Sequence, residues 1–170
     1  MRPQLPTLRS PLTVMQLASE MGRLYDIEKL TFFRACECYE ELEAAGKLDA
    51  DALIFVNSIA SVSLSDEDWA SYCEAHSAIL PKLVVEITEE EEMNERELER
   101  KRNVPGSTGV FALDDYGSGY SNGNSLLTIA PKYVKVDIAI IRGIDTDADK
   151  QQFLMTLIDY ACLLYTSPSP

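Results

Sequence analysis

Two adjacent carboxylates, Asp114 and Asp115, come directly after the apolar run 109–113, which has the length of a strand. Carboxylate oxygens at the end of a strand are the hard ligands that divalent cations prefer. The glycines after them give the next loop unusual backbone freedom. The stretch therefore predicts a metal site with a mobile loop beside it. That loop consists of Tyr116, Gly117, Ser118, Gly119, Tyr120 and Ser121.

Three other apolar runs of strand length carry a polar residue at or near their end. Asn57 follows the first run, Glu86 follows the second, and Lys135 stands between two valines in the last. A polar group among apolar neighbours costs free energy unless it is paired or bound to an ion. Because these residues occur on successive strands, we expect them to line one shared pocket.

The elements that position these residues alternate along the chain, so the sequence predicts an α/β fold with a parallel sheet. In such folds the functional groups gather at the carboxyl ends of the strands. The predicted strands are 52–57, 83–88, 109–115 and 133–141. The predicted helices are 10–22 with a cap at Ser10, 27–45, 65–76, 90–102, 124–130 and 147–161.

The formal net charge of −13 argues against a nucleic acid polymer as partner, because phosphate backbones require a basic protein face. Much of the acid lies between 89 and 99, with Arg96, Arg100, Lys101 and Arg102 interleaved or following. We expect this segment to be a solvated helix with charge pairs four residues apart, and a binding surface is the alternative.

The chain contains a single histidine, His76, which argues against a histidine metal cage or a Ser-His-Asp triad. The 4 cysteines form no CxxC pair, and we expect reduced thiols. No apolar stretch reaches the length of roughly 20 residues that a membrane helix needs, and the N-terminus lacks a signal-peptide core. These features predict a cytoplasmic protein whose chemistry depends on carboxylates, an amide and a lysine.

Four motifs, in this order and spacing, resemble those of the EAL domain family of cyclic di-GMP phosphodiesterases. The motifs are Val56-Asn57, Glu86-Ile87-Thr88-Glu89, the stretch from Asp114 to Ser121, and Lys135-Val136-Asp137. The segment 141–147 is also typical of the family. The block with two aspartates and two glycines is the most specific of these, and the lone asparagine is the weakest.

The resemblance implies a (β/α)8 TIM barrel that hydrolyses cyclic di-GMP to linear pGpG with two Mg²⁺ or Mn²⁺ ions in bacterial signalling. It also implies a role for each matching residue. Lys135 would hold or activate the attacking water, and Glu89 would position the loop 117–121. The metal ligands would be Asn57, Glu86, Asp114 and Asp115.

The chain departs from the family at its two ends and at a few positions of the motifs. Tyr116, Ser118 and Val136 replace the family's usual Phe, Thr and Ile, and every charged ligand is kept. No Glu-Ala-Leu signature comes before Pro11, and no later glutamate strand or Gln-Gly signature follows Tyr160. A TIM barrel typically has about 250 residues, so we expect 1–161 to be a partial domain. Residues 162–170 are predicted to be a non-native tail, because a sequencing-adaptor string would encode them.

Two alternatives to a cyclic di-GMP phosphodiesterase stay open. One is an inactive EAL-type domain that serves as a cyclic di-GMP receptor or a protein-interaction module. The other is an unrelated metal-dependent barrel enzyme, which would have to explain four matching motifs in order. We also expect the parent protein to carry a sensory or GGDEF-type domain and to form a homodimer.

Overall fold

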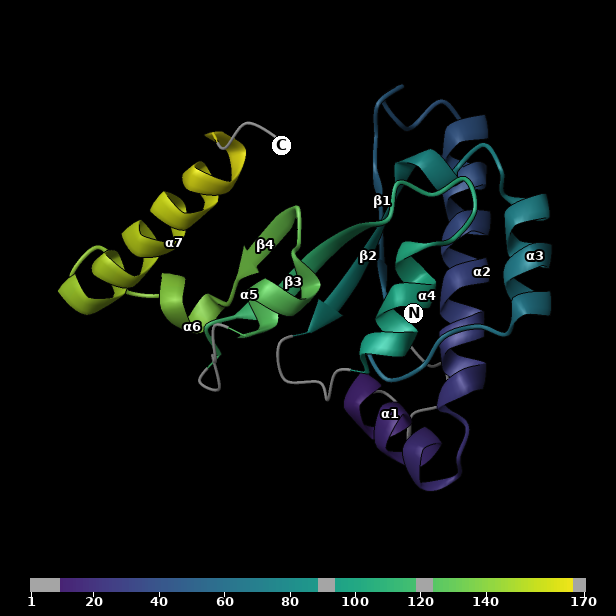
Figure 1. Ribbon diagram of the computed structural model, residues 1–170, viewed down its shortest axis with the longest axis horizontal. Coiled ribbons are helices and arrows are strands. Elements are labelled where there is room, and N and C mark those ends of the chain that lie inside the picture. Colours follow the sequence, from purple (N-terminus) through teal and green to yellow (C-terminus); the bar gives the residue numbers. More distant parts are fainter. Residues whose placement is uncertain (1–9, 89–93, 119–123, 167–170) are drawn as a thin grey trace.

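The structure is a computed structural model that describes residues 10–88, 94–118 and 124–166, with side chains described as far as 162. Helices and strands alternate along most of it (Figure 1). The helices are α1 Pro11–Glu20, α2 Leu24–Ala44, α3 Asp66–Ala75, α4 Glu95–Arg102, α5 Asn124–Ile129, α6 Ile138–Ile141 and α7 Ala148–Thr166, with a 3-10 turn η2 at Leu80–Lys82. The strands are β1 Ile54–Asn57, β2 Leu83–Thr88, β3 Val110–Tyr116 and β4 Tyr133–Val136.

The strands form one parallel sheet in the order β1-β2-β3-β4, as the alternating pattern predicts. The sheet is strongly curled. The rings of Phe55 on β1 and Tyr133 on β4 meet edge to face with centroids 5.4 Å apart, although these strands occupy opposite edges of the sheet. Since strands pair at about 4.8 Å, a flat sheet would keep the two backbones about three times that distance apart. The described sheet is therefore an arc of a barrel, with these rings on its inner face.

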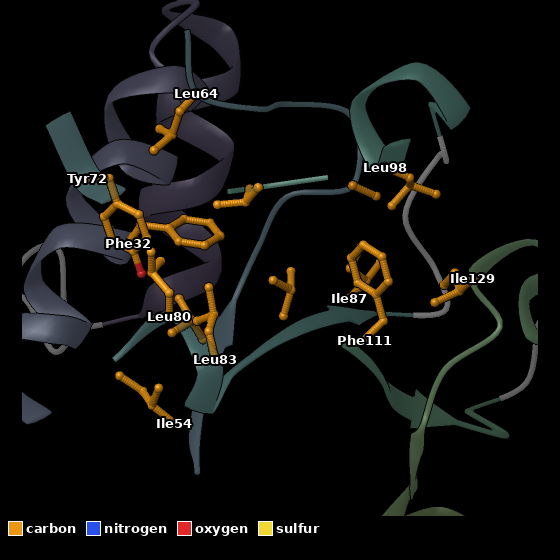
Figure 2. Packing of buried hydrophobic residues seen from close by; sticks show 14 of the residues in the cluster. Phe32, Ile54, Leu64, Tyr72, Leu80, Leu83, Ile87, Leu98, Phe111 and Ile129 are labelled. Atoms are coloured by element: carbon orange, nitrogen blue, oxygen red, sulfur yellow. The ribbon is translucent and has the colours of Figure 1, made fainter. Parts of the chain in front are cut away.

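The core lies on the outer side of this arc, where α2 and α4 lie beside β1 and β2 and α3 packs against α2 (Figure 1). Phe32 of α2 meets Trp69 and Tyr72 of α3 edge to face, with ring centroids 5.2 and 5.7 Å apart. Figure 2 shows Phe32 and Tyr72 near Leu80 and Leu83, where the chain enters β2. Burying one such large apolar side chain stabilises a fold by about 1.5–3 kcal/mol, so this cluster holds the helices on the sheet.

Several predicted boundaries and one predicted cap differ from the structure. The strand predicted at 133–141 ends at Val136, because the Asp137 side chain accepts a hydrogen bond from Ala139 N at 2.6 Å and starts α6. Ser10 precedes α1 but makes no side-chain cap bond. Helix α7 continues to Thr166, through the position where the sequence predicts the helix to end.

The prediction of a solvated charged helix is wrong at one residue of α4. Glu95, Arg96 and Glu99 are exposed, whereas Lys101 is only 1% exposed. Lys101 comes three residues after the buried Leu98, and residues three apart share a helix face. Its charge is therefore carried into the interior.

Candidate functional site

The parallel register brings the predicted site residues onto the inner face of the sheet. Asn57 at the end of β1 stands opposite Glu86 of β2, and Thr88 of β2 stands opposite Asp114 of β3. Since side chains alternate along a strand, Glu86 and Thr88 share a face, and their partners share it with them. Asn57, Glu86 and Asp114 thus meet at the carboxyl ends of three neighbouring strands.

Lys135 of β4 joins this group and bridges two of the carboxylates. Its Nζ lies 2.6 Å from Glu86 Oε1 and donates a hydrogen bond to Asp114 Oδ2 at 2.9 Å. Partial burial lowers the pKa of Lys135, but the bonds and charges of Glu86 and Asp114 outweigh that effect and raise it above its usual value. Lys135 therefore carries a positive charge at neutral pH.

Glu86 is the buried member of the group, with 6% of its side chain exposed. Its Oε1 lies 2.6 Å from the Lys135 ammonium, which supplies a positive partner for this buried carboxylate. A buried carboxylate without such a partner would cost free energy.

A bulge in β3 explains how two consecutive carboxylates avoid the helical layer. The pairing of β3 with β4 shifts between Leu113 and Tyr116, and Asp115 has a φ of 54°. Leu113 and Tyr116 both belong to the core, at 0% and 7% exposure, with two residues between them instead of one. The extra residue lets Asp114 and Asp115 follow each other without either entering the core.

The loop after the carboxylates begins at Gly117, which is closely packed. Its φ is +94°, and a Cβ there would lie 2.8 Å from Ile140 Cγ1. The Tyr116 ring stacks on Phe153 of α7, with centroids 6.0 Å apart. Helices α6 and α7 therefore fix the start of the loop. Ser118 is described, whereas the predicted site residues Glu89, Gly119, Tyr120 and Ser121 lie outside the described residues.

Asp137 has a structural partner at this edge of the sheet. Besides capping α6, it donates its backbone N–H to the Tyr116 carbonyl oxygen at 3.0 Å. The turn that follows Lys135 is thereby tied to the end of β3.

The donor set fits a hard divalent cation in type, although the carboxylates are not gathered as a full cage. Among the described residues, no three Asp, Glu, His or Cys side chains converge as a metal site. The amide of Asn57 and the carboxylates of Glu86 and Asp114 offer oxygen ligands on one face. Residues of this chain could therefore supply part of a metal site.

The sequence did not predict that two charged residues lie buried together behind this face. Lys101 Nζ lies 2.9 Å from Glu28 Oε1 of α2, and both side chains are buried. Glu28 begins the stripe that continues with Phe32, Cys36 and Tyr39 on the buried side of α2. A carboxylate in register with an apolar helical stripe is the signal that could have revealed it.

Comparison with known proteins decides the family. The family model described as the EAL domain matches residues 1–163. The chain belongs to the EAL domain family. The resemblance of the four motifs is thereby confirmed.

A curated relative is the probable cyclic di-GMP phosphodiesterase PdeG of Escherichia coli, which is 26% identical over 157 residues. The match covers 89% of this chain and 31% of the relative, so the chain spans about a third of that protein's length.

Solved EAL structures share the fold. A complex of the PaMucR phosphodiesterase with c-di-GMP matches with a TM-score of 0.75 at 23% identity, over 96% of this chain and 68% of the other. A standalone EAL protein of Vibrio cholerae in its c-di-GMP-bound form matches with a TM-score of 0.69 at 21% identity, over 94% and 67%. The predicted TIM-barrel architecture is confirmed at the level of the fold, and the four described strands form an open part of it. No helix in the described ranges is long and apolar enough to span a membrane.

Proposed function

We propose that the parent protein of this EAL domain hydrolyses cyclic di-GMP to linear pGpG with the help of Mg²⁺ or Mn²⁺. The observation that carries the proposal is the convergence of Asn57, Glu86, Asp114 and Lys135 on the inner face of the sheet. The family match and the curated relative support the substrate. The reaction adds one water across one phosphodiester bond, so the ring opens to a 5′-phosphate and a 3′-hydroxyl.

The residues of the chain divide this work between them. Asn57, Glu86, Asp114 and Asp115 would hold the metal ions. Such ions supply Lewis-acid activation of a phosphoryl oxygen and lower the pKa of water. The Lys135 ammonium lies next to both Glu86 and Asp114, from where it can donate hydrogen bonds to water or to a phosphate oxygen. Glu89 would brace the loop 117–121 and thereby control access to the substrate.

The test is turnover in the full-length parent. Cyclic di-GMP is incubated with the protein and Mg²⁺ or Mn²⁺, and the product is identified by chromatography and mass spectrometry. Wild type should form pGpG, and Glu86→Gln should abolish turnover. Glu43→Gln is the matched control. It also removes a glutamate that pairs with a lysine, Lys82, but Glu43 lies on α2, away from the candidate site, so turnover should be unchanged. Absence of pGpG from wild type with either metal contradicts the proposal.

The second candidate is a receptor that binds cyclic di-GMP without cleaving it. One observation favours it, because the Lys135 ammonium forms ion pairs with both Glu86 and Asp114. A receptor of this kind should bind cyclic di-GMP equally well with and without EDTA. Calorimetry under both conditions separates it from a phosphodiesterase, whose binding and turnover should depend on the metal.

A further inference from the structure

The buried ion pair of Glu28 and Lys101 lies outside the candidate site and has no role in the proposed reaction. Their side chains are 1% and 0% exposed, and the charged atoms are 2.9 Å apart. Burial raises the pKa of Glu28, and the charge of Lys101 and three hydrogen bonds oppose that rise. Removing two charges from water is expensive, and replacing such a pair by apolar residues is often neutral or stabilising. Stability alone is therefore a weak reason for this pair to be present.

The hydrogen bonds of the pair converge on the two residues that follow Asn57. Ser58 Oγ donates to Glu28 Oε1 at 2.6 Å, and Ile59 N donates to Glu28 Oε2 at 2.8 Å. Lys101 Nζ donates to Ser58 Oγ at 2.6 Å and to the Ile59 carbonyl oxygen at 2.5 Å. Side chains of two helices, α2 and α4, thus form hydrogen bonds with the same short segment, through the Ile59 backbone and the Ser58 hydroxyl.

The sheet holds the same segment from the other side. Ser58 donates its backbone N–H to the Glu86 carbonyl oxygen at 2.9 Å, directly after the position where Asn57 pairs with Glu86. Ser58, Ile59 and Ala60 are buried, whereas the Asn57 side chain is exposed on the inner face. The chain therefore turns sharply into the helical layer after Asn57, and the ion pair anchors the far side of that turn.

We propose that Glu28 and Lys101 are positioning residues that hold Asn57 beside Glu86 for ligand binding. The inference rests on the proposed function, in which the Asn57 amide contacts the bound metal. Glu28 and Lys101 reach the site only through residues 58 and 59. Groups that orient a metal ligand in this way typically change metal affinity about 10- to 100-fold when removed.

The discriminating variant replaces both charges together, as Glu28→Leu with Lys101→Met, in the full-length parent. It leaves no unpaired charge in the core, so the fold should survive, with a melting temperature lowered only by the lost partners of Ser58 and Ile59. Hydrogen exchange at the amides of 58–60 should rise, and Mn²⁺ affinity, measured by electron paramagnetic resonance, should fall about 10- to 100-fold. Ser58→Ala removes only the hydroxyl that both Glu28 and Lys101 contact. It should also raise hydrogen exchange at 58–60 and lower Mn²⁺ affinity, and it tests the inference if the double variant does not fold.

Two comparisons exclude a merely structural role. Arg100→Met is the matched control, because it removes the neighbouring cation of α4, which pairs with Asp66 and not with 58–59, and it should leave Mn²⁺ affinity unchanged. In an Asn57→Ala background the double replacement should have no further effect on Mn²⁺ affinity, since its route to the metal has been removed.

Each result decides a separate point. Unchanged exchange at 58–60 in both Glu28→Leu with Lys101→Met and Ser58→Ala overturns the inference, and so does an equal loss of Mn²⁺ affinity with and without Asn57. If wild type binds no Mn²⁺, the metal-dependent function is wrong, while faster exchange at 58–60 still supports the positioning of that segment.

Discussion

Gly117→Ala is predicted to destabilise the protein in two ways at once, through backbone strain and through overlap with α6. Gly117 has a φ of +94°, which an L-residue adopts at a cost of roughly 1–2 kcal/mol. The new Cβ would also lie 2.8 Å from Ile140 Cγ1 and 3.3 Å from Ile140 Cδ1. Overpacking of this kind typically costs about 1–3 kcal/mol. The two terms together give a loss of about 2–5 kcal/mol.

A matched control separates the two terms. Gly143 has a φ of +74°, but a Cβ added there would meet no atom within 4 Å, so Gly143→Ala should show the backbone term alone. The difference between the two variants then measures the contact with Ile140. Combining Gly117→Ala with Ile140→Ala should recover part of the loss, because the clashing atoms are removed.

The assay is urea unfolding of wild type, the two glycine variants, Ile140→Ala and the double variant, with the free energy of unfolding extrapolated to water. Equal losses in Gly117→Ala and Gly143→Ala would refute the packing argument, as would strict additivity in the double variant. Gly117→Ala should also lower turnover, because Tyr116 and Gly117 set the direction in which the loop leaves the carboxylates.

Three further predictions concern the site and the core. Asp114→Asn should lower turnover of the parent by orders of magnitude and change the unfolding free energy by less than about 1 kcal/mol, because its ion pair is solvent-accessible; turnover assays and urea unfolding measure the two effects. Glu86→Gln should abolish metal binding in calorimetry, whereas Glu89→Gln should keep metal affinity near wild type and lower turnover; equal losses of affinity would place Glu89 on the metal. Burial raises the pKa of Cys36 from 9.0 to about 11, so alkylation at pH 8 should modify the exposed Cys38 and spare Cys36. The thiol of the unfolded chain ionises at a lower pH than the buried thiol, so the free energy of unfolding should fall as the pH rises from about 9 to 11.

The parallel sheet could be predicted from the sequence because its strands are short, apolar and separated by helices. The span 83–88 of β2 agrees with the prediction at both ends. The predicted strand that contains Lys135 is too long, because the β-branched residues at 138, 140 and 141 favour a strand. In the structure Asp137 caps a helix at this point, and residues 138–141 are helical. The strand propensity of residues 138–141 takes no account of the hydrogen bond from Ala139 N to the Asp137 side chain, which favours the helix.

Lys101 shows what local pattern cannot supply. Alternating charges on α4 are typical of a solvated helix, and most of them are solvated. The partner that makes burial of Lys101 tolerable, Glu28, lies 73 positions earlier in the chain, and the oxygen atoms that complete the cluster follow β1. A long-range pair of this kind is fixed by tertiary packing, which periodicity within one helix does not encode.

The bulge in β3 constrains the number of residues between Leu113 and Tyr116. With one residue fewer between Leu113 and Tyr116, regular alternation would still place both side chains in the core, but one of the two carboxylates would be lost from the strand end. With one residue more, the second carboxylate would be carried past the strand end. The interval between the leucine and the tyrosine therefore sets how many carboxylates the strand end presents, and variation in this part of the domain is expected to take the form of substitutions and not of insertions or deletions.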